Sequence, residues 1–305
     1  MSEDKPQSPK AKIRQRLLLD EEYKIISSLG TGGMAEVFKA EQVSLNRTVA
    51  IKKLKSSLSQ NPEMLERFYR EGQSTANLQH ENIVQVYQMG KAGEEHYIVM
   101  EYVEGRDLKS ILKARGPLPW KVAALIIREV AKGLAFAHQR GYIHRDIKPG
   151  NIMLSQRGEV KIMDFGIVRR IDSELTKTGA FLGTPSYMSP EQLKGENLTP
   201  GSDLFSVGVV FYEILAGEKP FRADTEAGLI HKIVNEKPKA IRKLNPEVPW
   251  RLARIIKRLL NKNPRKRFAN AEELAQALER ILGKALIARS NLEIARYLAG
   301  MGDLA

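Results

Sequence analysis

A glycine-rich stretch near the start of the chain sets the first constraint on the fold. Residues 27–42 read SSLGTGGMAEVFKAEQ, with three glycines and then Ala35 where the pattern Gly-x-Gly-x-x-Gly has its last glycine. In dinucleotide-binding folds such glycines open a helix whose amino terminus meets the pyrophosphate. Here they lead into Val37, Phe38 and further alternation, which predicts a strand. The dinucleotide interpretation therefore fails, and a strand–glycine turn–strand hairpin remains.

Length and composition indicate an ordinary globular chain. Its 305 residues, 42% hydrophobic and 28% charged, are enough for two sizeable lobes. The absence of cysteine excludes disulfides, thiolate metal sites and cysteine nucleophiles. The first ten residues lack a secretory signal, and the apolar run that starts at Val207 is too short to cross a bilayer. We expect a cytoplasmic protein, or the cytosolic part of a membrane-anchored protein if more sequence follows the carboxyl end.

The first third of the chain predicts strands around one helix. From Tyr23 to about residue 100, short runs with strand-like alternation are separated by turn residues. One helix interrupts them: Asn61 can cap it, Pro62 suits its first position and Leu65 begins an apolar stripe. We therefore expect a small β-rich region with a single helix.

Beyond residue 105 the sequence predicts helices. Residues 120–141 and 200–216 match two long helices, the second apolar nearly all round and therefore buried. Capping-box patterns occur at Asn270 and Ser290, each with a glutamate three residues later, so two more helices should begin there. Each of these two helices should stop at a glycine, Gly283 and Gly300 respectively.

Four further motifs follow in a fixed order. VAIK ends at Lys52 on a strand-like run, YIHRDIKPGNIML begins at Tyr142, IMDFGIV begins at Ile162, and GTPSYMSPE runs from Gly183 to Glu191. Each motif alone is a modest match, but their order and their spread over a full domain length exclude coincidence. The chain resembles the protein kinase family, and within it the eukaryotic-like Ser/Thr kinases of bacteria.

The resemblance implies an α+β, bilobal protein-kinase fold. A small β-rich N-lobe would carry one key helix, and a larger C-lobe would be mainly helical. The implied segments are an amino-terminal basic, polar extension at 1–22, a catalytic domain at 23–283 and a tail with a short capped helix at 284–305. Within the domain, the N-lobe would span 23–100, the hinge 101–105 and the C-lobe 106–283. We expect the tail helix, with Leu292, Ala295 and Leu298 along one side, to pack on its own helical lobe; docking to a partner or to a second copy is the alternative.

The resemblance also implies the chemistry, which is transfer of the γ-phosphoryl group of ATP to Ser/Thr hydroxyls of protein substrates. This reaction needs positioning and charge neutralisation more than covalent work. Lys52, held by an ion pair with Glu71, would contact the α- and β-phosphates. Asp146 would be the catalytic base, Lys148 would steady the γ-phosphate, and the hydroxyl of Thr184 would reach that pair. Lys148 and Thr184 favour Ser/Thr over tyrosine as acceptor.

Metal and nucleotide sites follow from the same resemblance. Asn151 and Asp164 would bind Mg²⁺, with Mn²⁺ as a substitute, because amide and carboxylate oxygens suit hard cations. Ala35 should be tolerated at the far side of the glycine turn. The residues implied in ATP binding are Leu29, Gly30, Thr31, Gly32, Gly33, Val37, Ala50, Lys52, Met100, Glu101, Val103 and Met153.

Five matched residues are implied to be structural. His144 and Phe165 would pack beneath the site, and Asp203 would accept backbone hydrogen bonds from the catalytic loop. Glu191 and Arg267 would form a buried ion pair.

Regulation is implied by Arg145, which precedes the catalytic aspartate. A phosphate on Thr176 or Thr178 would order the activation segment by meeting this arginine. The kinase would then be activated by autophosphorylation, and self-association would allow that reaction to occur in trans.

The charge distribution and a rival function stay open at this point. The net charge is +13, and residues 241–267 hold ten Lys/Arg against one acid. A solvated helix face is the favoured interpretation; without an aromatic ladder no nucleic-acid partner is expected, and acidic partners are weakly favoured. The rival hypothesis is a pseudokinase or nucleotide-binding scaffold, which the retained Lys52, Asp146, Asn151 and Asp164 argue against. Ser189, where the family most often has alanine, is a small departure.

Overall fold

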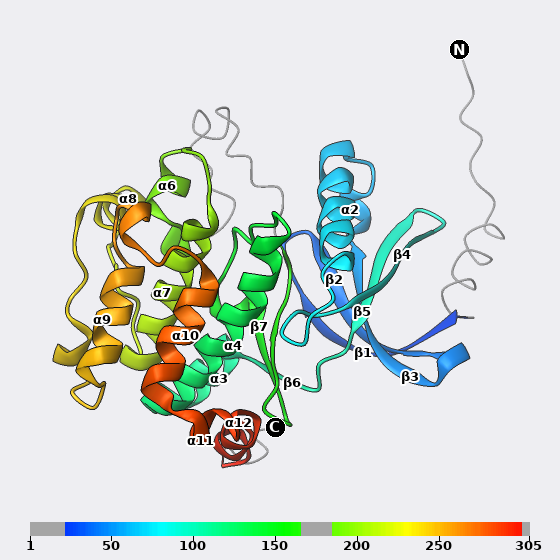
Figure 1. Ribbon diagram of the computed structural model, residues 1–305. Helices are drawn as coiled ribbons and strands as arrows, with labels where there is room; N and C mark the ends of the chain where they lie inside the picture. Colours follow the sequence, from blue (N-terminus) through cyan, green and yellow to red (C-terminus); the bar gives the residue numbers. More distant parts are fainter. Residues whose placement is uncertain (1–21, 166–184, 301–305) are drawn as a thin grey trace. The chain divides into compact units, whose positions relative to one another are not determined.

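A computed structural model of the protein describes residues 22–165 and 185–300 (Figure 1). Contacts divide these residues into two compact units. The small unit holds residues 22–79 and 84–102, and the large unit holds residues 80–83, 103–165 and 185–300. The first is mostly strand and the second mostly helix, which confirms the predicted α+β division.

The small unit is a five-stranded antiparallel sheet with one helix. The strand order is β1-β2-β3-β5-β4. Helix α2 packs against β4 (Figure 1). The elements are β1 (Tyr23–Thr31), β2 (Ala35–Gln42), β3 (Arg47–Leu54), α2 (Pro62–Ala76), β4 (Val86–Ala92) and β5 (Glu95–Glu101).

Helix α2 begins where the sequence predicts. The Asn61 side chain accepts hydrogen bonds from the backbone N–H groups of Glu63, at 3.0 Å, and Met64, at 3.2 Å, and Pro62 takes the first helical position. These contacts satisfy amide groups that a helix start leaves without partners. Phe68 is fully buried in the small unit, with Ala35, Leu54, Val86 and Ile98.

The large unit combines helices with a three-stranded sheet of order β6-β7-β8. Helices α7, α10 and α12 all pack on α4, which places α4 at the centre of this unit (Figure 1). The longer elements are α3 (Leu108–Arg115), α4 (Trp120–Gln139), α7 (Pro200–Ala216), α8 (Glu226–Asn235), α9 (Trp250–Leu259), α10 (Ala271–Leu282) and α12 (Ser290–Ala299). The shorter ones are β6 (Gly105–Asp107), β7 (Ile152–Ser155), β8 (Val160–Ile162), α6 (Pro190–Leu193) and α11 (Lys284–Ile287).

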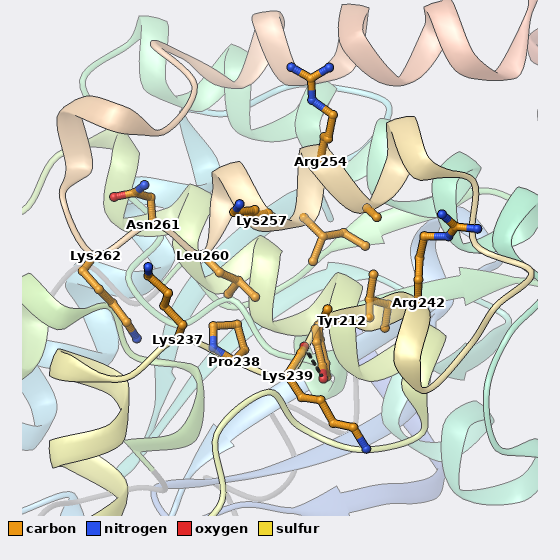
Figure 2. A pocket seen from close by; sticks show the side chains of 14 residues that line it. Tyr212, Lys237, Pro238, Lys239, Arg242, Arg254, Lys257, Leu260, Asn261 and Lys262 are labelled. Carbon is orange, nitrogen blue, oxygen red and sulfur yellow. Dashed lines mark hydrogen bonds between the residues drawn. The ribbon is translucent and has the colours of Figure 1, made fainter.

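Hydrophobic patterning explains how the helices are buried. The predicted span of α7 is confirmed at both ends, and its side chains are buried on every face, as an all-apolar helix requires. Helix α9 is the opposite case: Leu252, Ile255 and Ile256 are buried while arginines and lysines cover its outer face. Beside that face a cavity opens between α9 and residues 237–242 (Figure 2).

The tail helix α12 differs from the prediction in its start. Ser290 is the first helical residue and makes no cap, because the chain arrives already turned from α11 and Arg289 takes the cap position without a side-chain bond. At α10, by contrast, Asn270 does cap the helix by accepting from the N–H of Glu273. The Glu273 carboxylate binds the N–H of Ala269 and not that of Asn270, so the reciprocal box is absent there too.

The tail packs on the large unit, as expected, but with another face. Ile294 is completely buried, whereas Leu292 of the predicted stripe is 47% exposed. A close approach to Gly158 fixes this face: a Cβ atom there would stand 1.9 Å from the carbonyl oxygen of Asn291. Its φ of +80° also favours glycine. Within residues 22–165 and 185–300, no helix is long and apolar enough to cross a membrane.

Candidate active site

Lys52 and Glu71 meet in the small unit as predicted. Lys52 lies on β3 and its Nζ is 2.5 Å from Oε1 of Glu71 on α2. Their side chains are 11% and 17% exposed. A charge-assisted bond of this length holds the lysine in one direction while leaving part of it open to solvent.

Gly72 explains how α2 brings Glu71 so close to the sheet. A Cβ atom at Gly72 would lie 2.3 Å from Sδ of Met89 and 3.0 Å from Cδ1 of Ile98. A larger residue would therefore have to displace the side chains of Met89 and Ile98, or push α2 away from β4 and β5 and Glu71 with it. The glycine after the glutamate is thus a positioning feature that the sequence analysis passed over.

Strand register places several predicted nucleotide residues on one face of the sheet. Val37 stands opposite Lys52, and Ala50 stands opposite Met100. Opposite residues in an antiparallel pair share a face, and so do residues two apart on one strand. Val37, Ala50, Lys52 and Met100 therefore lie on the same side of the small unit.

The glycine turn joins β1 and β2, which confirms the hairpin interpretation. The N–H of Gly32 donates to the carbonyl of Ala35 at 2.8 Å and closes the turn. Ala35 is the first residue of β2 and is only 4% exposed, packed with Leu54 and Phe68. Its methyl group belongs to the core of the small unit and does not merely occupy the far side of the turn, as the sequence analysis expected.

The remaining nucleotide candidates fall in both units. Leu29, Gly30, Thr31 and Gly33 belong to the small unit with Glu101, and Val103 and Met153 belong to the large unit. The N–H of Glu101 donates to the carbonyl of Gln85 at 2.8 Å. A ring contact by Glu101 would therefore have to use its carbonyl oxygen.

The loop before β7 brings three predicted residues together in the large unit. Nζ of Lys148 lies 2.6 Å from Oδ2 of Asp146. Nδ2 of Asn151 donates to the same Oδ2 at 3.2 Å and to the Asp146 carbonyl at 2.9 Å. The Asp146 side chain keeps 30% of its surface exposed. A carboxylate is thus fixed through one oxygen while the other can meet a substrate.

His144 supports this loop from below, and its protonation state follows from its partners. Nε2 lies 2.9 Å from the Met163 carbonyl, which only accepts, so Nε2 carries the hydrogen. Nδ1 then accepts from the N–H of Asp146 at 3.2 Å. Burial lowers the pKa of His144 below its ordinary value, which agrees with a neutral ring. The ring also packs on Phe165, with centroids 4.6 Å apart, as predicted.

Asp203 on α7 holds the same loop through both oxygens. Oδ2 accepts from the N–H of His144 at 2.8 Å and from Nε2 of His138 at 2.7 Å, and Oδ1 accepts from the N–H of Arg145 at 2.8 Å. Burial by itself raises the pKa of Asp203, but these donors outweigh it and hold the pKa below its ordinary range. A charged, fully satisfied carboxylate therefore anchors the loop to α7.

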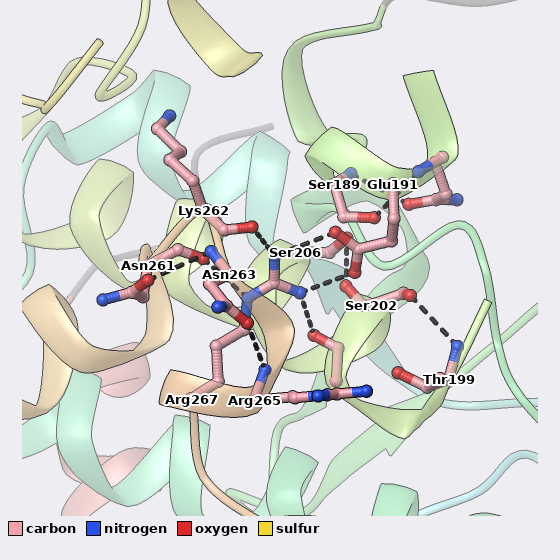
Figure 3. A network of polar contacts seen from close by, with 12 residues as sticks. Ser189, Glu191, Thr199, Ser202, Ser206, Asn261, Lys262, Asn263, Arg265 and Arg267 are labelled. Atoms are coloured by element: carbon pink, nitrogen blue, oxygen red, sulfur yellow. Dashed lines mark hydrogen bonds and ion pairs between the residues drawn. The ribbon is translucent and has the colours of Figure 1, made fainter. Parts of the chain in front are cut away.

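Glu191 and Arg267 form a second fixed point (Figure 3). Nη1 and Nη2 of Arg267 reach Oε1 and Oε2 of Glu191 at 2.6 and 2.8 Å. The guanidinium also donates to the carbonyls of Asn261, Gly201 and Lys262. Burial raises the pKa of Glu191, yet the hydrogen bonds and charge of Arg267 outweigh that and leave it lowered. The predicted buried ion pair is present.

Two backbone positions in this region are strained. Arg145 has φ of +67° and Asp164 has φ of +55°, values that non-glycine residues rarely adopt. Arg145 precedes the implied catalytic base Asp146, and Asp164 is itself an implied metal ligand; backbone strain is often concentrated at such positions. The Asp203 bond to the Arg145 N–H and the Gln192 bond to its carbonyl, at 2.8 Å, hold the first of them in place.

The donor set fits a hard cation. Because Nδ2 of Asn151 binds Asp146, Oδ1 is the side-chain atom of Asn151 left to act as a ligand. The N–H of Met163, next to Asp164, donates to the Asn151 carbonyl at 2.9 Å and so ties the two segments together. Among the described residues no three His, Asp or Glu side chains form a metal cluster. One carboxylate and one amide suit a cation that takes its other ligands from water and phosphate.

The sequence analysis did not predict the contact of His138 or the capping role of Ser189, and three of the predicted residues are not described by the structure. His138 has no motif of its own, and its partner is remote in sequence. Ser189 caps α6 in a reciprocal capping box with Gln192, a pattern that the letters SPEQ could have revealed. Three predicted residues lie outside the described ranges: Thr176, Thr178 and Thr184.

Comparison with known proteins agrees with this geometry. The model of the protein kinase domain matches residues 23–278. Serine/threonine-protein kinase PknB of Mycobacterium leprae is 41% identical over 269 residues, which cover 86% of this chain and 43% of that protein. PrkC of Bacillus subtilis is 40% identical over 253 residues, covering 83% and 39% respectively.

Solved structures give the same picture. The crystal structure of the Mycobacterium tuberculosis PknI kinase domain matches with a TM-score of 0.66 and 27% identity, covering 85% of this chain and 95% of that one. The chain spans only about two fifths of the length of the curated relatives, 43% of PknB and 39% of PrkC. By sequence, fold and site together, the chain belongs to the protein kinase domain family.

Proposed function

We propose that this chain is an active Ser/Thr protein kinase that uses ATP and a divalent cation. The observation that carries the proposal is the arrangement of Asp146, whose Oδ2 is held by Lys148 and Asn151. The position of the Lys52–Glu71 pair supports it independently. The names of the relatives, which are serine/threonine-protein kinases, point in the same direction.

Each residue has a role that its contacts make feasible. Oδ1 of Asp146 accepts the hydrogen of the substrate hydroxyl, which orients the oxygen for attack on the γ-phosphorus. Nζ of Lys148 lies beside the Asp146 carboxylate, so it can neutralise charge on a γ-phosphate that is placed there for attack. Lys52 binds the α- and β-phosphates, with Glu71 fixing its direction.

The cation, which we infer to be Mg²⁺ with Mn²⁺ as a substitute, neutralises phosphate charge when bound. Asn151 through Oδ1 and Asp164 through its carboxylate are the residues that would hold it. In a cation titration, Mg²⁺ and Mn²⁺ should support activity and Ca²⁺ should not, because Ca²⁺ prefers longer bonds and more ligands.

Phosphosite mapping by mass spectrometry after incubation with Mg·ATP tests the activity. Wild type should acquire phosphate on Ser or Thr, and Asp146→Asn should not. Asp224→Asn, an exposed change of the same chemistry, is the matched control and should behave as wild type. Equal modification of all three proteins, or none, would favour a nucleotide-binding scaffold and would contradict the proposal.

Regulation by the activation segment is a finer part of the proposal. Phosphate on Thr176 or Thr178 would activate the enzyme, with Arg145 as its receptor. The Thr176→Ala/Thr178→Ala double variant should then turn over a peptide substrate more slowly than wild type, and unchanged turnover would refute this step. An initial autophosphorylation rate that rises with the square of protein concentration would indicate that two copies react in trans.

A further inference from the structure

The large unit contains a cavity that the proposed catalytic residues do not use. It has a volume of about 420 Å³ and lies between α9 and residues 237–242, with Tyr212 of α7 at its base (Figure 2). Ile241, Ile256 and Leu260 line it and are themselves buried. A cavity of this size and lining is within the range of natural ligand sites.

The floor of the cavity is apolar. The Tyr212 hydroxyl, the polar group at its base, already donates to the carbonyl of Lys239 at 3.0 Å (Figure 2). Ala253 and Pro238 add small apolar surfaces to the lining, and Asn261 lies at its edge with Lys262. An apolar side chain entering here would displace water without leaving a polar group unsatisfied.

The rim, by contrast, carries charge of one sign. It consists of five exposed cationic residues on two facing walls: Lys237, Lys239, Arg242, Arg254 and Lys257. Among the residues that the structure describes, none of the five forms an ion pair, and no Asp or Glu lines the cavity.

Other members of the basic run have partners inside the fold. Arg267 forms the buried ion pair with Glu191, and Arg258 forms an ion pair with Glu273 at 2.8 Å. Lys262, at one end of the cavity, points its Nζ at the carbonyl of Ile233 and over the ring of Phe221, 3.8 Å from the centroid. The run therefore mixes structural cations with solvent-facing ones, and the rim belongs to the second group.

We propose that this cavity is a docking site for an acidic segment of a partner protein, with an apolar side chain in the cavity and carboxylates on the rim. Charge complementarity favours a peptide over a single amphiphilic anion. Five cations on two walls match several acids spaced along a chain, whereas one carboxylate would leave most of the rim without a counter-charge. The proposal concerns binding alone and does not depend on the proposed kinase activity.

Fluorescence anisotropy with the full chain tests it. The probe is a fluorescein-labelled peptide in which a central phenylalanine lies between two runs of glutamate. Two comparison peptides replace the phenylalanine by alanine or every glutamate by glutamine. We expect the first peptide to bind tightest, with an affinity that falls as salt is raised. Equal binding by all three peptides would overturn the proposal.

Matched charge reversals locate the site. Arg242→Glu/Arg254→Glu changes one rim residue on each wall and should weaken probe binding by about tenfold or more. Lys243→Glu/Arg251→Glu makes the same change in net charge at two exposed residues that do not line the cavity. This control pair should weaken probe binding by less than about threefold. If both pairs weaken binding equally, the effect is general electrostatics and the docking site is refuted.

Filling the cavity tests the apolar anchor. Ala253→Leu places extra carbons in the cavity and should remove the difference between the phenylalanine and alanine peptides while glutamate dependence persists. Thermal unfolding followed by tryptophan fluorescence checks that the variants fold, and Ala253→Val, which adds fewer carbons to the cavity, is the second filling variant should Ala253→Leu unfold. Retained discrimination in a folded Ala253→Leu would overturn the anchor. Binding to phosphatidylglycerol vesicles through Arg242 and Arg254, with no peptide binding, would overturn the partner-protein proposal in favour of a membrane surface.

Discussion

In the small unit, Lys52 and Glu71 meet at 2.5 Å, and in the large unit Arg267 and Glu191 meet at 2.6 and 2.8 Å. The distances are similar, but the surroundings differ. Side-chain exposure is 11% and 17% for the first pair, against 0% and 2% for the second. Arg267 additionally donates to three backbone carbonyls, so that its guanidinium is bonded on every side.

This difference separates a structural ion pair from one that can serve a ligand. A buried pair is tolerated only when every charge and lone pair is satisfied, because desolvation costs several kcal/mol per ion, roughly. Once satisfied it has no capacity for anything else. The Lys52–Glu71 pair keeps part of its surface in solvent, which is what a lysine needs if it is to bind phosphate as well.

Removal of the buried cation should give the largest effect on stability. Arg267→Met leaves Glu191 charged, buried and without its counter-ion, so the free energy of unfolding should fall by about 3–5 kcal/mol. Both tryptophans, Trp120 and Trp250, lie in the large unit, so urea unfolding followed by tryptophan fluorescence reports on that unit. The exposed Arg265→Met is the control and should change stability by less than about 0.5 kcal/mol. A loss as small as the control's would mean that the pair is not structural.

The second largest effect is expected at Asp203, which anchors the loop before β7. Asp203→Asn replaces a charged acceptor of three donors by a neutral amide whose NH₂ group faces one of them. Stability should fall by about 2–3 kcal/mol, since hydrogen bonds to charged groups are the stronger ones. The same fluorescence measurement applies, with Asp224→Asn as the control. If Asp203→Asn were as stable as wild type, the two hydrogen bonds from the His144 and Arg145 N–H groups would not be holding the loop.

The main residues of these ion pairs and hydrogen bonds can be predicted from sequence motifs, but the residues that support them cannot. Asp203, Glu191 and Arg267 were predicted because they stand at fixed places around recognisable motifs. His138 was not, because a histidine that donates to a remote aspartate has no local pattern. The cavity beside α9 was equally invisible, since it depends on how two segments pack.

Short helices show a second limit. The cap of α2 could be predicted because Asn61 and Pro62 give independent, local signals. At α12 the serine and the glutamate match a capping box, yet the preceding turn from α11 decides where the helix begins. The buried face is then chosen by contact with Gly158 and α4, which selects Ile294. Local sequence patterns therefore predict that a helix forms, whereas tertiary contacts decide where it begins and which face it buries.

The pH dependence of stability allows a comparison of one buried histidine in each unit. Burial lowers the pKa of His144 in the large unit and of His96 in the small unit below 6.5. The unfolded chain then binds more protons just below that pH, so stability should fall as pH drops from 7.5 to 5.5, by at most about 1.4 kcal/mol per pH unit for each histidine. His144→Gln should flatten this slope in tryptophan fluorescence, whereas His96→Gln should flatten it only in circular dichroism, which reports on both units. A slope unchanged by His144→Gln would contradict its neutral, buried state.

The smallest stability effect is expected for Lys52→Met. Glu71 is 17% exposed and can be partly hydrated when Lys52 is lost, so the free energy of unfolding should fall by about 1–2 kcal/mol, less than for Arg267→Met. Function should respond in the opposite way, because the proposed phosphate contact is removed: autophosphorylation should drop by about a hundredfold. The measurement pairs urea unfolding, followed by circular dichroism, with phosphate incorporation. The matched control is Lys53→Met, which lies on the same strand as Lys52 and loses an ion pair with Glu95 of β5. A Lys52→Met protein that lost stability like Arg267→Met would show that the two ion pairs are of one kind and that exposure does not separate function from structure.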